Sequence, residues 1–255
     1  MKELSGKTAV ITGASSGIGR ATAIRLAEAN ANLILHYCSN RAGIDKTLDL
    51  LPGGGTAELI QADFLRADKR AQFFEGCVAE DRQIDILVNN AGGDVLTTEK
   101  KNWSFEDKLD FLWNLDVKSC MDLSRRFGAH MSQNRGSKPC IINIGWDQAP
   151  LGQAGENGEI FATTKGAIMS FTRSLAKSLA PVVRVNCVAP GWIQTSWGES
   201  TSEYWDQRAR SESLLGRWGT ADDVANAIVM LSREESEFIN GQTVEVNGGL
   251  GFGSS

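Results

Sequence analysis

The sequence predicts a single-domain α/β protein, with a Rossmann-like, doubly wound parallel sheet of about seven strands and helices on both faces. Short β-rich runs alternate with longer helical patterns along the chain, most runs are apolar on both faces, and a glycine-rich turn follows the first run. These three observations carry the prediction. The runs are Thr8–Thr12, Asn32–Tyr37, Thr56–Gln61, Ile84–Asn89, Cys140–Ile144, Val182–Val188 and Thr243–Val246.

Helical spacing is clearest in two segments. Between the fifth and sixth runs, Ile168, Phe171, Leu175 and Leu179 are spaced by three and four residues, as on the apolar face of a helix. A second helix is expected to begin at Thr220, where Thr-Ala-Asp-Asp is typical of a capping box. No repeat or break in composition divides residues 1–255, so one nucleotide-binding domain is expected. Ligands of such sheets bind beyond the carboxyl ends of the strands.

Composition excludes several classes of protein. The 255 residues are 42% apolar and 22% charged, with a net charge of −5, which argues against a nucleic-acid partner. The N-terminal apolar run is too short for a signal peptide or a membrane span, so a cytoplasmic protein is expected. Cysteines without C-x-x-C spacing indicate reduced thiols rather than disulfides or a metal site. They are Cys38, Cys77, Cys120, Cys140 and Cys187.

The glycine-rich turn after the first run is the first candidate site. Gly13 permits a tight turn, Gly17 lets the backbone approach a pyrophosphate, and Gly19 permits close packing of helix on sheet. The N-terminus of the following helix offers N–H groups and a partial positive charge to phosphates. A purely structural turn is the alternative, but the order strand, turn, helix favours a dinucleotide. The turn also contains Ser15, Ser16 and Ile18.

The spacing Gly-x-x-x-Gly-x-Gly resembles that of the short-chain dehydrogenase/reductase family, and within it the 3-oxoacyl-carrier-protein reductases. Four further segments match the family in order and spacing, over essentially the whole chain. They are Asp63 after the third run, Asn89–Gly92 at the end of the fourth, Pro190–Thr195 after the sixth, and Asn247–Gly249 after the last. The resemblance implies a nicotinamide dinucleotide as cofactor.

The resemblance also assigns residues to that cofactor. Asp63 and Phe64 are expected at the adenine ring, and Ile193 and Thr195 at the nicotinamide carboxamide. The segment after the sixth run opens with Pro190 and Gly191, and the ribose side is expected to be lined by Asn90, Ala91 and Gly92.

The end of the second run indicates which dinucleotide binds. An acid there accepts a hydrogen bond from the adenine ribose 2′-hydroxyl and repels a 2′-phosphate. The segment His36–Arg41 has no carboxylate, whereas Ser39, Asn40 and Arg41 can donate to a phosphate. NADP(H) is therefore expected, and a solvated Arg41 at the start of a helix is the alternative.

Chemistry in the family that this chain resembles rests on Asn, Ser, Tyr and Lys. The tyrosine exchanges a proton with the substrate, the lysine one helical turn later lowers the tyrosine pKa and binds the ribose, the serine orients the substrate oxygen, and the asparagine belongs to a proton relay. Asn114 and Lys165 match this pattern. Phe161 stands at the tyrosine position and Trp146 at the serine position, which implies an atypical site.

Other groups are candidates for supplying the proton. Asp147 lies next to the serine position and Glu159 two residues before Phe161, although both are also typical of solvated carboxylates. Tyr204 lies in the segment 196–213, which is expected to form a lid, where a packing role is the alternative. Aromatic residues also predict an apolar pocket, with ordinary core packing as the alternative. They are Trp146, Phe161, Trp192, Trp197 and Trp205.

We therefore expect an NADP(H)-dependent oxidoreductase that acts on a small carbonyl, hydroxyl or unsaturated substrate. Its proton donor would be non-standard, namely Asp147, Tyr204 or water. A catalytically silent NADP(H)-binding protein that senses the cofactor or stabilises a partner is the alternative. By analogy with the family, we expect a homo-oligomer, a tetramer or a dimer, that pairs the helices around Asn114 and Lys165.

Overall fold

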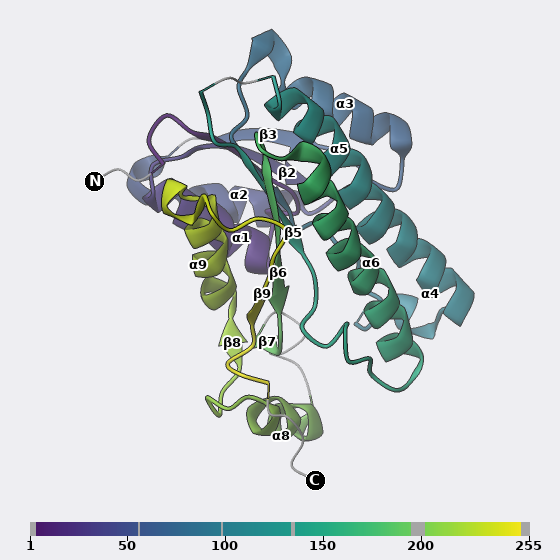
Figure 1. The fold of residues 1–255 in the computed structure, drawn as a ribbon. Coiled ribbons are helices and arrows are strands. Elements are labelled where there is room, and N and C mark those ends of the chain that lie inside the picture. The colour runs from purple at the N-terminus through teal and green to yellow at the C-terminus, as the bar shows by residue number, and fades with distance from the viewer. Residues whose placement is uncertain (1–3, 56, 98, 134–135, 195–201, 251–255) are drawn as a thin grey trace.

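The computed structural model describes residues 4–55, 57–97, 99–133, 136–194 and 202–250. Within these ranges, seven parallel strands form one sheet in the order β3-β2-β1-β4-β5-β6-β9 (Figure 1). The order reverses between β1 and β4, so the sheet is the doubly wound one that the sequence predicts. The strands are β1 (Thr8–Ile11), β2 (Asn32–Tyr37), β3 (Ala57–Gln61), β4 (Ile86–Asn89), β5 (Cys140–Ile144), β6 (Arg184–Pro190) and β9 (Thr243–Val246).

Each expected run overlaps one of these strands, and β2, β5 and β9 have the expected bounds. The largest difference is in β6, which begins and ends two residues later than expected. The N–H groups of Val182 and Val183 instead donate to the carbonyl of Leu179 and close the preceding helix. Thr56, the first residue of the third run, lies outside the described residues.

Helices cover both faces of the sheet, and each face has its own core (Figure 1). Leu26 of α1 and Ile228 of α9 belong to one buried apolar cluster, and Phe73 of α3 and Phe127 of α5 belong to the other. One layer consists of α1 (Gly17–Glu28), α2 (Arg41–Asp49) and α9 (Ala221–Ser232), and the other of α3 (Ala67–Cys77), α4 (Phe105–Leu112), α5 (Ser119–Met131) and α6 (Glu156–Leu179).

Local signals in the sequence explain where two of these helices lie. The expected apolar stripe falls on α6, where Ile168 and Leu175 are buried. The predicted capping box is present at α9: the Asp223 N–H donates to Thr220 Oγ1 at 3.1 Å, and the Thr220 N–H donates to Asp223 Oδ2 at 2.8 Å. Both predictions are confirmed.

A buried chain of polar side chains fixes α5 and α6 against the sheet. Asn89 Nδ2 donates to Ser124 Oγ at 2.8 Å and to Asn143 Oδ1 at 2.9 Å. Asn143 Nδ2 in turn donates to Thr172 Oγ1 at 2.9 Å. These bonds join β4 and β5 to both helices, and such buried networks specify one packing arrangement. They thereby position the residues of α6 that face the carboxyl edge of the sheet.

Beyond that edge lie α8 (Glu203–Glu212) and the short pair β7 (Ile193–Gln194) and β8 (Gly219–Thr220) (Figure 1). These elements stand next to the carboxyl ends of the strands, where ligands of such sheets bind. Among the described residues, the structure has no helix with the length and apolar character needed to cross a membrane.

Candidate functional site

The turn between β1 and α1 has the geometry of a phosphate-binding turn. Gly13 and Gly17 have φ values of 67° and 52°, a left-handed conformation that favours glycine. A Cβ atom on Gly19 would lie 2.2 Å from the carbonyl oxygen of Gly13, so no side chain fits there. The N-cap is Ser16, Ile18 lies in the first turn, and N–H groups of a first turn have no partner within the helix. The turn therefore fits a pyrophosphate.

The end of β4 closes the other side of this turn. Thr12 Oγ1 accepts hydrogen bonds from the N–H groups of Asn90 and Ala91, both at 2.9 Å. Asn90 Nδ2 donates to the carbonyls of Thr12 and Gly13 at 3.0 and 3.2 Å. Asn90 and Ala91 thus hold the glycine turn in place, and their contact with a ribose stays a prediction.

His36 supports the same turn from β2. Its Nδ1 accepts from the Gly13 N–H at 3.1 Å, and its Nε2 lies 2.9 Å from the carbonyl of Ala62, so Nε2 carries the proton. Burial lowers the pKa of His36 from 6.5 to about 4, because the charged imidazolium is disfavoured away from water. The neutral ring therefore joins the phosphate turn to the end of β3.

The segment expected to select NADP(H) lies exposed at the end of β2. Asn40 Oδ1 caps α2 by accepting from the Gly43 N–H at 2.9 Å. Arg41 Nε donates to both carboxylate oxygens of Asp45 at 3.0 Å, and its Nη1 lies 3.4 Å from the Tyr37 hydroxyl. The sequence prediction overlooked Asp45, which stands one helical turn after Arg41. Because Arg41 binds Asp45 through Nε and Tyr37 through Nη1, these contacts orient the guanidinium.

Asp63 and Phe64 follow β3 but face in different directions. Asp63 Oδ1 accepts from the Leu65 N–H at 3.0 Å in an exposed turn. The Phe64 ring is buried in the core and stacks on His36, with ring centroids 3.8 Å apart. The expectation of an adenine contact therefore cannot rest on the Phe64 ring.

A cavity of about 780 Å³, the large cavity, opens at the carboxyl edge of the sheet. Ile18 borders it at the start of α1, Gly191 and Ile193 after β6, and Phe161 and Lys165 on α6. Pro190 also lines it. Since Ile18 belongs to the phosphate turn, the cavity continues directly from the nucleotide site, and its residues fit the nicotinamide end of a dinucleotide. Thr195 lies outside the described residues.

Lys165 is bound to a buried carboxylate. Its Nζ lies 2.9 Å from Asp116 Oδ2, with side-chain exposures of 16% for Lys165 and 2% for Asp116. Asp116 Oδ1 also accepts from the Gly93 N–H at 2.8 Å, and a Cβ atom on Gly92 would lie 3.2 Å from Oδ2. Asp116 lies in a π-helical turn, Trp113–Lys118, between α4 and α5. Turns of this kind are frequent at functional sites.

The Asn114 side chain is engaged on its own helix, and a role of Asn114 in a proton relay stays a prediction. Asn114 Nδ2 donates to the carbonyl of Asp110 at 2.7 Å, and its Oδ1 accepts from Lys118 Nζ at 2.9 Å on the outer face of the helix. Helical spacing carried a signal for Asp116, because Leu112, Asp116 and Cys120 are four residues apart on one buried stripe. A carboxylate on an apolar stripe needs a buried partner.

Phe161 and Trp146 line the same cavity as Lys165. Phe161 lies one turn before Lys165 on α6, and Trp146 follows β5. Their rings meet edge to face, with centroids 6.3 Å apart. The pair gives an apolar aromatic wall at the place where the lysine enters the cavity.

Asp147 lies behind that wall. It is 2% exposed, and neither carboxylate oxygen has a hydrogen-bond partner among the described residues. Burial raises its pKa to about 6. A Cβ atom on Gly191 would lie 2.8 Å from Asp147 Oδ2, so the carboxylate packs against the back of a cavity residue without lining the cavity itself.

The other candidate acids do not line the large cavity. Glu159 is exposed and does not line it, as expected of a solvated carboxylate. Tyr204 is 64% exposed and packs on Trp205, with ring centroids 5.1 Å apart. Trp205 and Trp192 do line the cavity, which places α8 at its rim. Trp197 lies outside the described residues.

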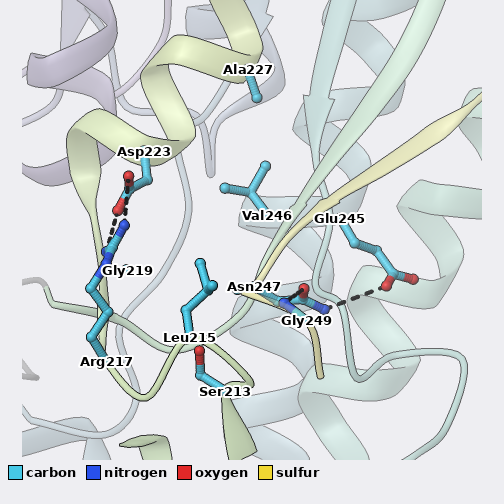
Figure 2. A pocket seen from close by; sticks show the side chains of 11 residues that line it. Ser213, Leu215, Arg217, Gly219, Asp223, Ala227, Glu245, Val246, Asn247 and Gly249 are labelled. Atoms are coloured by element: carbon cyan, nitrogen blue, oxygen red, sulfur yellow. Dashed lines mark hydrogen bonds and ion pairs between the residues drawn. The ribbon is translucent and has the colours of Figure 1, made fainter. Parts of the chain in front are cut away.

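A smaller cavity, about 320 Å³, lies between α9, the end of β9 and the segment after α8 (Figure 2). Arg217 points to Asp223 and binds it at 2.8 Å, and Asn247 points to Glu245 at 3.4 Å. Leu215 projects between these two pairs. Among its lining residues in the described part of the chain, neither Lys165 nor an aromatic side chain is found. The large cavity is therefore the candidate active site.

Comparison with known proteins is consistent with this geometry. Residues 13–251 match the family described as enoyl-(acyl carrier protein) reductase. The chain is 30% identical over 249 residues to a 3-oxoacyl-(acyl-carrier-protein) reductase of Staphylococcus aureus, which covers 96% of this chain and 98% of the relative. The corresponding reductase of Thermotoga maritima is 32% identical over 252 residues, covering 97% and 98%. A solved short-chain dehydrogenase of Burkholderia cenocepacia in complex with NADP has 28% identity and a TM-score of 0.83, covering 97% and 98%.

Proposed function

Because the chain belongs to the short-chain dehydrogenase/reductase family, we propose that it is an oxidoreductase that transfers hydride between NADP(H) and a small substrate in the large cavity. The observation that carries this proposal is the continuity between the phosphate turn and the large cavity at Ile18. Hydride chemistry is supplied by the bound dinucleotide, and this chain's residues bind it, orient it and exclude water.

The proposed preference for NADP(H) over NAD(H) rests on the end of β2. Arg41 and Ser39 are exposed there, and Asp45 orients the guanidinium by its Nε edge. A guanidinium presented in this way pairs well with the oxygens of a 2′-phosphate. The solved NADP complex of the Burkholderia relative is consistent with this choice.

We also propose that the protein does not use a tyrosine as its acid. Phe161 has no hydroxyl, Trp146 takes the space next to it, and Lys165 is paired with Asp116. Since neither Asp147 nor Tyr204 lines the large cavity, water is the remaining one of the three candidate proton donors for a carbonyl substrate. Ketone reduction should therefore be slow, because a positioned acid typically contributes ~10²–10⁴ in rate.

A silent cofactor-binding protein is the second candidate function. The buried ion pair of Lys165 and Asp116 favours it, since this pair occupies the lysine that would otherwise act on tyrosine and ribose. The two functions are distinguished by titrating NADPH with nicotinamide fluorescence and then measuring NADPH oxidation over ketones, enones and imines. Binding without turnover of any compound favours the silent protein, and turnover of one compound supports the enzyme. Absence of NADPH binding would contradict both.

The proposed homo-oligomer would pair the layer that contains α5 and α6, by analogy with the family. Light scattering at micromolar concentration tests it. A tetrameric or dimeric mass is expected, and a monomeric mass would contradict the proposal.

A further inference from the structure

The large cavity offers few groups that can move a proton. Among the described residues that line it, Glu156 and Lys165 are the two with titratable side chains. Tyrosine, serine, threonine, histidine and cysteine are absent from that described lining. Reduction of a ketone forms an alkoxide, which must be protonated, so this lining is poorly suited to ketones.

Lys165 is held by a buried carboxylate. Its ammonium lies 2.9 Å from the buried Asp116 carboxylate, which the Gly93 N–H also binds. A carboxylate this deeply buried needs a compensating charge, and the lysine supplies it. The opposite charges of the pair therefore offset one another at this end of the cavity.

The remaining charge and the aromatic walls favour a cation. Lys165 and Glu156 are the charged residues of the described lining. Asp116, which does not line the cavity, offsets Lys165, so Glu156 at the exposed start of α6 is the charge that remains. Trp146 and Phe161 present aromatic rings beside it, and aromatic faces attract cations. The rim already shows this preference: Arg208 lies 5.6 Å from the ring centroid of Trp192 and 5.3 Å from that of Trp205.

We infer that the substrates are iminium ions, cationic C=N compounds with an apolar or aromatic body, an inference that rests on the proposed hydride transfer. The reaction forms one C–H bond at the iminium carbon, and the C=N π pair becomes the lone pair of the product amine. NADPH is the reductant and leaves as NADP⁺. The positive charge passes from substrate to cofactor, so the step balances without a proton donor.

This assignment explains three features of the site together. An iminium ion needs no tyrosine, which fits Phe161. It needs no serine to orient a carbonyl oxygen, which fits Trp146. It would be repelled by an unpaired ammonium, which fits the ion pair of Lys165 with Asp116.

The test compares two compounds of similar shape: the permanently charged N-methyl-3,4-dihydroisoquinolinium ion and the neutral ketone 1-tetralone. NADPH oxidation is followed by the absorbance of the reduced nicotinamide, and the rate without protein is subtracted. The iminium ion is expected to react at least ~10²-fold faster than the ketone, the lower bound of what a positioned acid gives ketone reduction. Equal rates for the two compounds would overturn the inference.

Binding gives a second readout that does not depend on turnover. Quenching of tryptophan fluorescence measures the affinity of the non-reducible cation N-methylisoquinolinium, and Glu156→Gln is expected to weaken it by roughly two- to fivefold, as for one exposed charge. Glu159→Gln is the matched control, because Glu159 is an exposed acid on the same helix outside the lining, and it should leave this affinity unchanged.

The failure of this inference differs from the failure of the proposed function. If NADPH binds and an enone or ketone is reduced while the iminium ion is not, hydride transfer stands and the cationic substrate class is wrong. If NADPH does not bind, both proposals fail. If Glu156→Gln and Glu159→Gln weaken the cation equally, the cavity does not select it by charge and the inference is overturned.

Discussion

The two ends of the candidate site differ in which part of the chain forms them: the main chain at one end and side chains at the other. At the nucleotide end, backbone geometry does the binding: Gly19 leaves no space for a side chain, and Thr12 and His36 hold the main chain of the turn. At the proposed catalytic end, side chains form the site: Phe161 lines the cavity, and Lys165 is paired with Asp116. A backbone site follows from the fold, whereas a side-chain site changes without any change in the fold.

Because of this difference, the side chains of the large cavity can vary while the nucleotide turn keeps its geometry. Replacing a tyrosine ring by a phenylalanine ring removes one hydroxyl but keeps the packing of α6 against the sheet. Replacing Gly19 would instead force Gly13 to move, because a Cβ atom would lie 2.2 Å from its carbonyl oxygen. Cofactor binding and catalysis should therefore respond separately to mutation.

The largest expected effect comes from rebuilding the catalytic end. In the triple variant Asp116→Asn, Trp146→Ser, Phe161→Tyr, a hydroxyl stands one turn before Lys165, a serine replaces the indole, and the ammonium is released from its carboxylate. Reduction of 1-tetralone should rise by about 10²–10⁴, the usual contribution of a positioned acid. Steady-state kcat/KM with NADPH measures it.

The double variant Trp146→Ser, Phe161→Tyr is the control for Asp116. It should gain less than the triple variant, because Lys165 stays neutralised and lowers the new tyrosine pKa less. A triple variant that binds NADPH but reduces ketones no faster than the unmodified protein would show that the missing groups are not what limits the reaction.

The next effect concerns the pH dependence of the free energy of unfolding. His36, at the nucleotide end, and Asp147, near the catalytic end, are expected to change it in opposite directions. The pKa of His36 is lowered to about 4, so its stabilising contribution is present above pH 6.5 and is lost as pH falls toward 4. The pKa of Asp147 is raised to about 6, so its contribution is present below pH 3.8 and is lost as pH rises through 6. Each pKa shift corresponds to a change in the free energy of unfolding on the order of 3 kcal/mol.

Asp147→Asn should separate the two effects in urea unfolding. At pH 7 the variant should be more stable by up to about 3 kcal/mol, since no charge remains buried. As pH falls from 6.5 to 4, the free energy of unfolding of this variant should decrease by a similar amount, because His36 becomes protonated more readily in the unfolded chain. In the unmodified protein, the opposite pH dependence of Asp147 largely offsets this decrease. The double variant with His36→Asn should lack this slope. An Asp147→Asn variant with unchanged stability at pH 7 would contradict the assignment.

The sequence was sufficient to predict the nucleotide end of the site, which the main chain forms, but it did not predict all of the side-chain contacts at the catalytic end. Strand runs and the glycine turn are local patterns, so they could be placed before any tertiary contact was known. Asp116 was missed because its role depends on which helix face meets Lys165, and the neighbouring Asn114 matched a motif more closely. Likewise, nothing local in the sequence shows that the Phe64 ring turns into the core or that Asp45 binds Arg41.

A smaller effect is expected at the selective part of the nucleotide end. Arg41→Ala should weaken NADPH binding by roughly 1.5–3 kcal/mol, the contribution of a hydrogen bond to a charged group, and should leave NADH binding nearly unchanged. Fluorescence titration of both dinucleotides measures the difference. Asp45→Asn serves as the control, because it keeps Arg41 but removes the carboxylate that orients it. Equal affinity of the unmodified protein for NADPH and NADH would refute the proposed selectivity.

The smallest effect is expected from Phe161→Tyr alone, and it tests how independent the side chains of the catalytic end are. The new hydroxyl would stand next to the Trp146 ring, which lies 6.3 Å from Phe161 between centroids, and Lys165 would still be held by Asp116. The tyrosine would therefore have neither space for a ketone oxygen beside it nor a free ammonium to lower its pKa. Ketone reduction should change by less than about tenfold, well below the ~10²–10⁴ of a positioned acid. A gain of several orders of magnitude from this one hydroxyl would mean that the phenylalanine alone separates this site from ketone chemistry, and that Trp146 and Asp116 are bystanders.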